Sequence, residues 1–210
     1  MLSKFLTISF TSRYQAFLYH LLLSLLFAGG VLLFAKLAWY PGDLVFASGA
    51  VKIFFLVLLV DACFGPLITL LTYNLKKGFK ELNRDFLFIV LLQVCALAYG
   101  FYTLAGGRPV YYVFAVDRFE LVQANEIPHS FLKEAKEFGP YGDLPWWRVK
   151  WVYAELPKDN DARTDILFKQ IENGVDLAQT PKYFQSLDQG RDAIATVSYT
   201  HLTLPTIYSV

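Results

Sequence analysis

The hydrophobic positions of the chain concentrate in its first half, where they form three long apolar runs. These runs cover residues 16–39, 50–73 and 86–105. Each is about 20 residues or more, which is the length that a helix needs to cross a hydrocarbon core of about 30 Å. Small residues inside the runs, such as Gly29, Gly30 and Gly100, favour close helix packing. The pattern predicts an α-helical membrane protein, with three transmembrane helices in a membrane domain over residues 1–107.

Basic residues flank these runs unevenly, and this asymmetry predicts the orientation. The connector between the first two runs has no Lys or Arg, whereas basic residues lie before the first run and in the second connector, at Lys4, Arg13, Lys76, Lys77, Lys80 and Arg84. Basic connectors stay on the cytoplasmic side, so the amino terminus is predicted to be cytoplasmic. Three spans then place residue 108 onward in the periplasm of a bacterium, with the spans in the inner membrane. The first run is too long for a signal peptide and is interpreted as a retained anchor.

The second half of the chain alternates between extended and helical patterns. Residues 110–116 and 119–123 are predicted as two short strands or one bulged strand, residues 147–154 as a further strand, and residues 128–138 and 161–173 as helices. Period-2 alternation in the third strand predicts that Trp147, Trp151 and Tyr153 pack against the helix at 161–173, with Trp146 on the opposite face. An exposed aromatic patch there would instead indicate a partner surface. The sum is a small α+β periplasmic domain over residues 108–197.

Asp61, within the second apolar run, is the residue that most needs an explanation. A carboxylate at mid-membrane costs about 3 kcal/mol on insertion scales. Pro66 and Gly65 are expected to kink the helix and free a carbonyl near Ala62. One interpretation is an internal hydrogen bond from Asp61 to Tyr99 or Gln93 that fixes helix register. The other is a polar socket for the membrane helix of another protein.

Composition and motifs exclude several classes of function. A net charge of +1 with no basic patch in the second half argues against nucleic-acid binding. Cys63 and Cys95 both lie within the apolar runs, so no disulfide is expected in the exported domain. The exported half has no nucleophile motif, metal-ligand spacing or phosphate loop, so we expect no enzyme and no cofactor. A small membrane-bound enzyme or a sensory membrane module remains the alternative.

An ordered set of short phrases carries a family resemblance from about residue 13 to 190. The phrases are Trp39-Tyr40-Pro41-Gly42, Asp61 with Gly65-Pro66-Leu67, Gln93 with Tyr99-Gly100, Arg108-Pro109, Asp117-Arg118-Phe119 and Gly174-Val175-Asp176. Together they resemble the type IV pilin accessory proteins of the TfpX/TfpZ type. The resemblance implies an inner-membrane, pilin-specific chaperone or assembly modulator without a catalytic site, whose partner is the membrane helix and periplasmic head of a major type IV pilin. The candidate partner-binding or structural residues are Asp61, Gly65, Pro66, Gln93, Tyr99, Asp117 and Arg118.

The last residues, 198–210, depart from that family. They break the charged helical pattern that precedes them and resemble a peptide translated from sequencing-adapter DNA. We expect this tail to be non-native, and no function is assigned to His201 within it.

Overall fold

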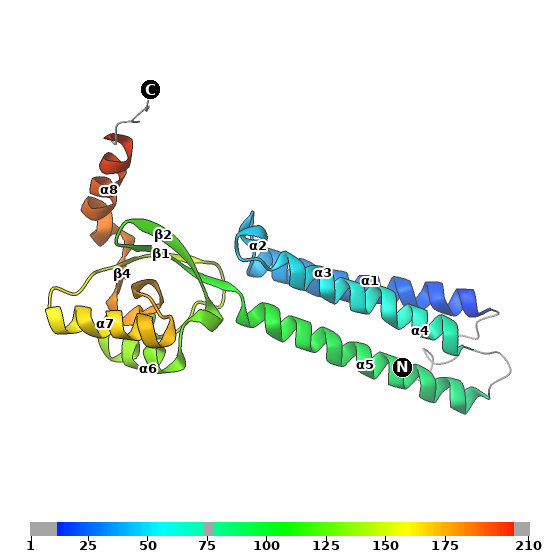
Figure 1. Cartoon of the computed structure of the whole chain (residues 1–210). Helices are drawn as coiled ribbons and strands as arrows, with labels where there is room; N and C mark the ends of the chain where they lie inside the picture. The colour runs from blue at the N-terminus through cyan, green and yellow to red at the C-terminus, as the bar shows by residue number, and fades with distance from the viewer. Residues whose placement is uncertain (1–11, 74–77, 204–210) are drawn as a thin grey trace, which may run out of the picture. The chain divides into compact units, whose positions relative to one another are not determined.

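A computed structural model describes residues 12–73 and 78–203 (Figure 1). The chain divides into two compact units. The helical unit contains the residues up to Ala38 together with Gly49–Ala105, and the α+β unit contains Trp39–Ser48 together with the residues from Gly106 onward. The connector after the first span therefore belongs to the α+β unit, although it is distant from the rest of that unit in sequence.

Three helices of the helical unit are long and apolar enough to cross a membrane, as the three runs predict. They are α1 (Arg13–Ala38), the continuous helix formed by α3 (Val51–Leu59), a π-helical turn η2 (Val60–Phe64) and α4 (Gly65–Thr72), and α5 (Phe79–Gly106). Gly100 of α5 confirms one predicted small-residue contact, because a Cβ atom there would lie 2.3 Å from Cγ2 of Val57. Gly29 and Gly30 make no such contact, since a Cβ atom at either position would meet nothing within 4 Å.

A four-stranded sheet organises the α+β unit, in the order β2-β1-β3-β4. Strand β1 pairs antiparallel with β2 and parallel with β3, and β3 pairs antiparallel with β4. The strands are β1 (Pro109–Ala115), β2 (Arg118–Gln123), β3 (Lys150–Ala154) and β4 (Phe184–Ser186), and the helices are α2 (Leu44–Ala47), α6 (His129–Phe138), α7 (Asn160–Asn173) and α8 (Arg191–Thr203). Short 3-10 turns are η3 (Ala124–Glu126), η4 (Pro140–Gly142), η5 (Leu177–Gln179), η6 (Pro181–Tyr183) and η7 (Leu187–Gly190). The predicted small α+β fold is confirmed.

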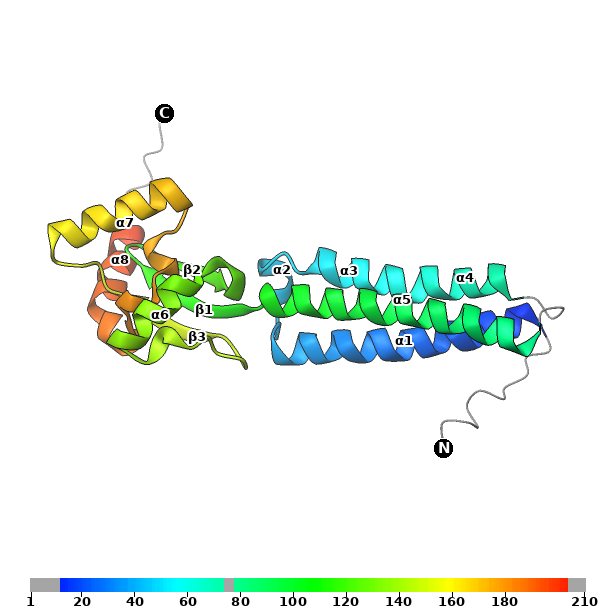
Figure 2. The same cartoon turned by 90° about the horizontal axis from the view of Figure 1, so that it is seen from below.

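Helices α6 and α7 lie on the same side of the sheet (Figures 1 and 2). The core forms in this layer, where Val113 of β1 and Val152 of β3 join Leu132 of α6 and Ile166 of α7. Burying an aliphatic side chain of this size contributes about 1.5–3 kcal/mol. Gly174 follows α7 with a φ of 64°, which is the left-handed conformation that commonly terminates a helix. The hydrophobic layer between sheet and helices thus holds the unit together.

The predicted register of the third strand is wrong. Val152 and Ala154 enter the core, while Trp151 on the other face is 53% exposed. Trp147 lies before β3, because Arg148 adopts a φ of 56° and this left-handed residue breaks the extended conformation on which the alternation depends. The aromatic residues of β3 therefore face away from the core layer that contains Ile166 of α7.

The final helix continues into the segment predicted to be non-native. Helix α8 runs from Arg191 to Thr203 without a break at Ser198. Ser, Thr and His are tolerated within helices at a modest cost. The remaining part of the expected tail, 204–210, lies outside the described residues.

Candidate functional site

Gln93 of α5 lies at the centre of a polar cluster that links the three candidate spans. Its amide nitrogen donates to Oγ of Ser24 at 3.1 Å and to the backbone carbonyl of Asp61 at 3.0 Å. Its amide oxygen lies 2.7 Å from Nε2 of His20. Ser24 and His20 belong to α1, and Asp61 belongs to the π turn of the second span. One side chain therefore connects all three helices.

The same contacts define the hydrogen positions on His20. A backbone carbonyl only accepts, so the nitrogen of the Gln93 amide faces Asp61 and its oxygen faces His20. Nε2 of His20 consequently carries a proton and donates. On the other side of the ring, Nδ1 lies 2.5 Å from Oγ1 of Thr69 in α4. His20 and Thr69 are both buried, so the ring of His20 is held by hydrogen bonds inside the helical unit.

Local features of the second span make room for Gln93 and supply its acceptor. A Cβ atom on Gly65 would lie 1.9 Å from the Gln93 amide nitrogen, so only glycine admits this side chain in its present position. In π geometry the carbonyl of Asp61 would pair with the nitrogen five residues on, which is that of Pro66 and has no hydrogen. The sequence predicted a free backbone carbonyl near Ala62. In the structure, the carbonyl that accepts a hydrogen bond from Gln93 is that of Asp61.

The carboxylate of Asp61 is enclosed, and within the described part of the chain it has no hydrogen-bond partner. Asp61 is 4% exposed, and both carboxylate oxygens are buried. Tyr99 is 73% exposed, so the expected Asp61–Tyr99 hydrogen bond is not formed, and Gln93 binds the backbone of Asp61 and not its side chain. The structure thus brings together Asp61, Gly65, Pro66 and Gln93 and leaves Tyr99 outside the cluster.

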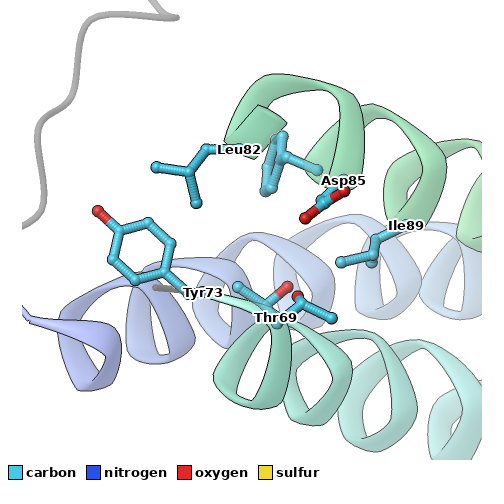
Figure 3. Close-up of a pocket in the computed structure, with 7 residues that line it drawn as sticks. Thr69, Tyr73, Leu82, Asp85 and Ile89 are labelled. Atoms are coloured by element: carbon cyan, nitrogen blue, oxygen red, sulfur yellow. The ribbon is translucent and has the colours of Figure 1, made fainter. Parts of the chain in front are cut away.

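A small hollow lies between α4 and α5, with Asp85 and Ile89 facing Thr69 and Tyr73 (Figure 3). Its volume is about 20 Å³. A space of this size admits about one water molecule. The hollow is therefore too small for a metabolite.

Asp117 lies in the turn between β1 and β2 in the α+β unit, and Arg118 is the first residue of β2. Arg118 Nε donates to Oε1 of Glu120 at 2.8 Å and lies 3.9 Å from Oδ1 of Asp117. The hydrogen bond to Glu120 is the main cause that raises the pKa of the exposed Arg118 guanidinium. Exposed pairs of this kind contribute little stability because water and salt screen them. These two candidates form a charged surface turn.

Five aromatic side chains share the sheet face opposite α6 and α7, and we call them the aromatic sheet face: Tyr112, Phe114, Phe119, Trp151 and Tyr153. The Tyr112 and Trp151 rings stack with centroids 4.4 Å apart, and Phe119 meets Trp151 edge-on at 5.5 Å. Phe119 and Trp151 are about half exposed. The sequence pattern singled out Trp151 and Tyr153, but it predicted that they pack in the core.

One end of the aromatic sheet face is covered by the chain itself. A Cβ atom on Gly190 of η7 would lie 2.5 Å from Cγ of Tyr153, so the backbone of this turn packs directly on that ring. Phe119 lies on the edge strand β2, at the other side of the sheet. The uncovered part of the face is therefore the part around Tyr112, Phe119 and Trp151.

These features define a class: a protein with three membrane-capable helices locked by an internal polar cluster, carrying an α+β unit with an open aromatic face. Among the described residues no group of three or more His, Cys, Asp or Glu side chains could hold a metal ion.

Comparison with known proteins identifies the family. The chain is 31% identical over 194 residues to the fimbrial assembly protein of serogroup I from Dichelobacter nodosus, covering 88% of this chain and 72% of that protein. It is also 31% identical over 167 residues to the serogroup E1 protein, covering 77% and 62%, and 36% identical over 116 residues to the protein of serogroups C1 and C2, covering 55% and 88%. The chain belongs to this family of type IV pilus-related accessory proteins, as the resemblance indicated. No family model matches it, and no solved structure matches it.

Proposed function

We propose that the protein acts in pilus biogenesis as a chaperone or assembly modulator of a major type IV pilin. In this proposal the amino terminus is cytoplasmic, the helices cross the inner membrane, and the α+β unit lies in the periplasm. The names of the relatives support a role in fimbrial assembly. They also favour assembly over catalysis, which makes a membrane enzyme or a sensory module the less supported alternative.

The observation that carries this proposal is the aromatic sheet face. A soluble domain that leaves a Trp half exposed beside stacked Tyr and Phe rings presents the residue types that dominate protein interfaces. The face belongs to the unit predicted to be exported, which is where a pilin head domain would be met. We assign the face around Tyr112, Phe119 and Trp151 to the pilin head.

Site-specific photocrosslinking tests this assignment in cells that express the pilin. A photoreactive residue at Trp151 or Phe119 is expected to capture the pilin. Phe168 on α7 is the matched control, because it is aromatic and exposed and lies in the helical layer on the other side of the sheet. Equal capture from position 168, or no capture from position 151 in a chain that accumulates normally, contradicts the proposal.

The membrane part of the proposal concerns Asp61. Because its carboxylate is enclosed, the helix of a pilin reaches it only if the three spans separate. We propose that such opening lets Asp61 bind a polar group of the pilin helix. Asp61→Leu is then expected to accumulate normally but to lose crosslinks between the second span and the pilin helix, with reduced piliation. Wild-type crosslinks and piliation in this variant would leave the aromatic sheet face as the pilin contact.

A further inference from the structure

The loop that precedes β3, together with the first residue of that strand, exposes two tryptophans and two cations within five residues. Trp146 and Trp147 are 48% and 58% exposed, and Arg148 and Lys150 are exposed as well. Arg148 has a φ of 56°, a left-handed conformation that is unfavourable for a non-glycine residue. Packing of the loop against its neighbours must compensate for this cost, so the loop has a defined shape.

Contacts inside the α+β unit place this loop beside the points where the chain leaves the first and third helices. The ring of Trp146 meets the ring of Trp39 edge-on, with centroids 5.6 Å apart. The guanidinium carbon of Arg108 lies 4.6 Å from the centroid of the same Trp146 ring. Trp39 directly follows Ala38, the last residue of α1, and Arg108 lies just beyond Gly106, the last residue of α5.

Connectivity then locates the loop relative to a bilayer. Consecutive spans run in opposite directions, so α1 and α5 end at the same membrane surface. Trp39 and Arg108 lie at that surface because they are covalently next to the helix ends. Trp146 contacts both of them, and therefore the loop lies at the same surface, although its sequence is remote from every span.

We propose that residues 146–150 form a membrane-interface anchor, with the indole rings among the lipid head groups and Arg148 and Lys150 against lipid phosphates. Indole combines an apolar ring with one N–H donor, which suits the boundary between head groups and acyl chains. Basic residues near an anionic membrane surface are attracted to its lipid phosphates. The inference rests on the three helices crossing a bilayer and is independent of any pilin contact.

The neighbouring connector extends this surface. Phe46 of α2 is exposed, and the carbonyl of Ser48 at the end of this connector accepts a hydrogen bond from Nε2 of Gln123 at 3.0 Å. Because the connector joins the ends of the first two spans, it too lies at the membrane surface. An aromatic side chain from a second segment therefore accompanies the two tryptophans.

Fluorescence quenching by lipid tests the anchor in the full chain reconstituted into nanodiscs. The chain has four tryptophans, and Trp147→Phe and Trp151→Phe are the matched variants because Trp147 lies in the proposed anchor and Trp151 lies on the aromatic sheet face. Lipid brominated near the head-group end of its acyl chains is the probe. Trp147→Phe is expected to lower the lipid-quenched fraction of the emission, and Trp151→Phe is expected to raise it. With iodide in the aqueous phase as the quencher, Trp147→Phe is expected to raise the quenched fraction of the emission, and Trp151→Phe is expected to lower it.

Equal effects of the two substitutions on lipid quenching would overturn the proposal, as would stronger iodide quenching of Trp147 than of Trp151. A second variant, Arg148→Gln with Lys150→Gln, separates the role of charge and leaves the four rings in place. It is expected to lower lipid quenching in anionic nanodiscs and to leave zwitterionic nanodiscs unchanged. Unchanged quenching in both lipids would refute the assigned role of the two cations. Loss of pilin crosslinking at Trp151 leaves all of these outcomes unaffected, so the two proposals fail separately.

Discussion

Replacing Gly65 by alanine tests the polar cluster directly. The new Cβ atom would lie 1.9 Å from the Gln93 amide nitrogen. Gln93 has a flexible side chain and can move, but it then leaves its contacts with His20, Ser24 and the Asp61 carbonyl. Hydrogen bonds within membrane proteins contribute about 0.6 kcal/mol each on average, so the three contacts together contribute about 2 kcal/mol.

Gly30→Ala is the matched control, because Gly30 also lies within a candidate span and a Cβ atom there meets nothing within 4 Å. Both substitutions gain the helix propensity of alanine over glycine, about 1 kcal/mol, and this gain cancels between them. Gly65→Ala is therefore expected to be about 2 kcal/mol less stable than Gly30→Ala. The free energy of unfolding can be measured by SDS titration of the protein in mixed micelles, followed by circular dichroism.

A double-mutant cycle decides whether Gln93 is the cause. In a Gln93→Ala background the clash and the three contacts are both absent, so the difference between Gly65→Ala and Gly30→Ala is expected to disappear. Equal stability of the two single variants would refute the steric argument. A difference that persists undiminished without Gln93 would show that Gly65 is required for another reason.

Two further predictions concern buried ionisable groups. Burial raises the pKa of Tyr111 from 10.0 to about 12, so the unfolded chain ionises first, and stability is expected to be constant below pH 10 and to fall as the pH rises toward 12. Tyr111→Phe is expected to reduce this loss of stability in alkaline unfolding curves. The remaining loss is due to Tyr40, whose pKa burial also raises to about 12. An unchanged curve would contradict the prediction for Tyr111. Asp61→Leu removes a buried carboxylate with no partner among the described residues and is expected to raise bundle stability in SDS by about 1–3 kcal/mol. Lower stability would show that the carboxylate is held by a favourable contact.

The three membrane-capable helices could be predicted because each apolar run is long enough to cross a bilayer as a single helix. Which face of each helix points into the bundle was harder to predict from the sequence, as Tyr99 illustrates. Six residues separate it from Gln93, and at 3.6 residues per turn the two side chains lie about 120° apart around α5. When Gln93 points into the bundle, Tyr99 points out of it. Gly100 lies seven residues from Gln93, on the same helix face, and it is the residue that packs against Val57.

The prediction of which face of β3 enters the core was wrong for a different reason. Both faces of the sheet carry apolar residues, since Val113 and Val152 alternate with Phe114 and Trp151. Period-2 alternation shows that the two sets face opposite ways, but the choice of core face depends on where α6 and α7 pack. The larger aromatic side chains looked like the core set from sequence alone. The smaller β-branched residues form it, because the helices cover their side of the sheet.

The distribution of polar and aromatic groups between the two units bears on how a pilin would be recognised. In the helical unit Gln93, His20, Ser24 and Thr69 already satisfy one another, so a passing membrane helix gains no hydrogen bond from them while the bundle is closed. Both carboxylate oxygens of Asp61 have no hydrogen-bond partner among the described residues, and they are enclosed. The α+β unit instead leaves its aromatic rings exposed without any rearrangement. In the proposed function, initial discrimination between pilins is therefore assigned to the aromatic sheet face, and contact with Asp61 is proposed to follow only once the three helices have separated.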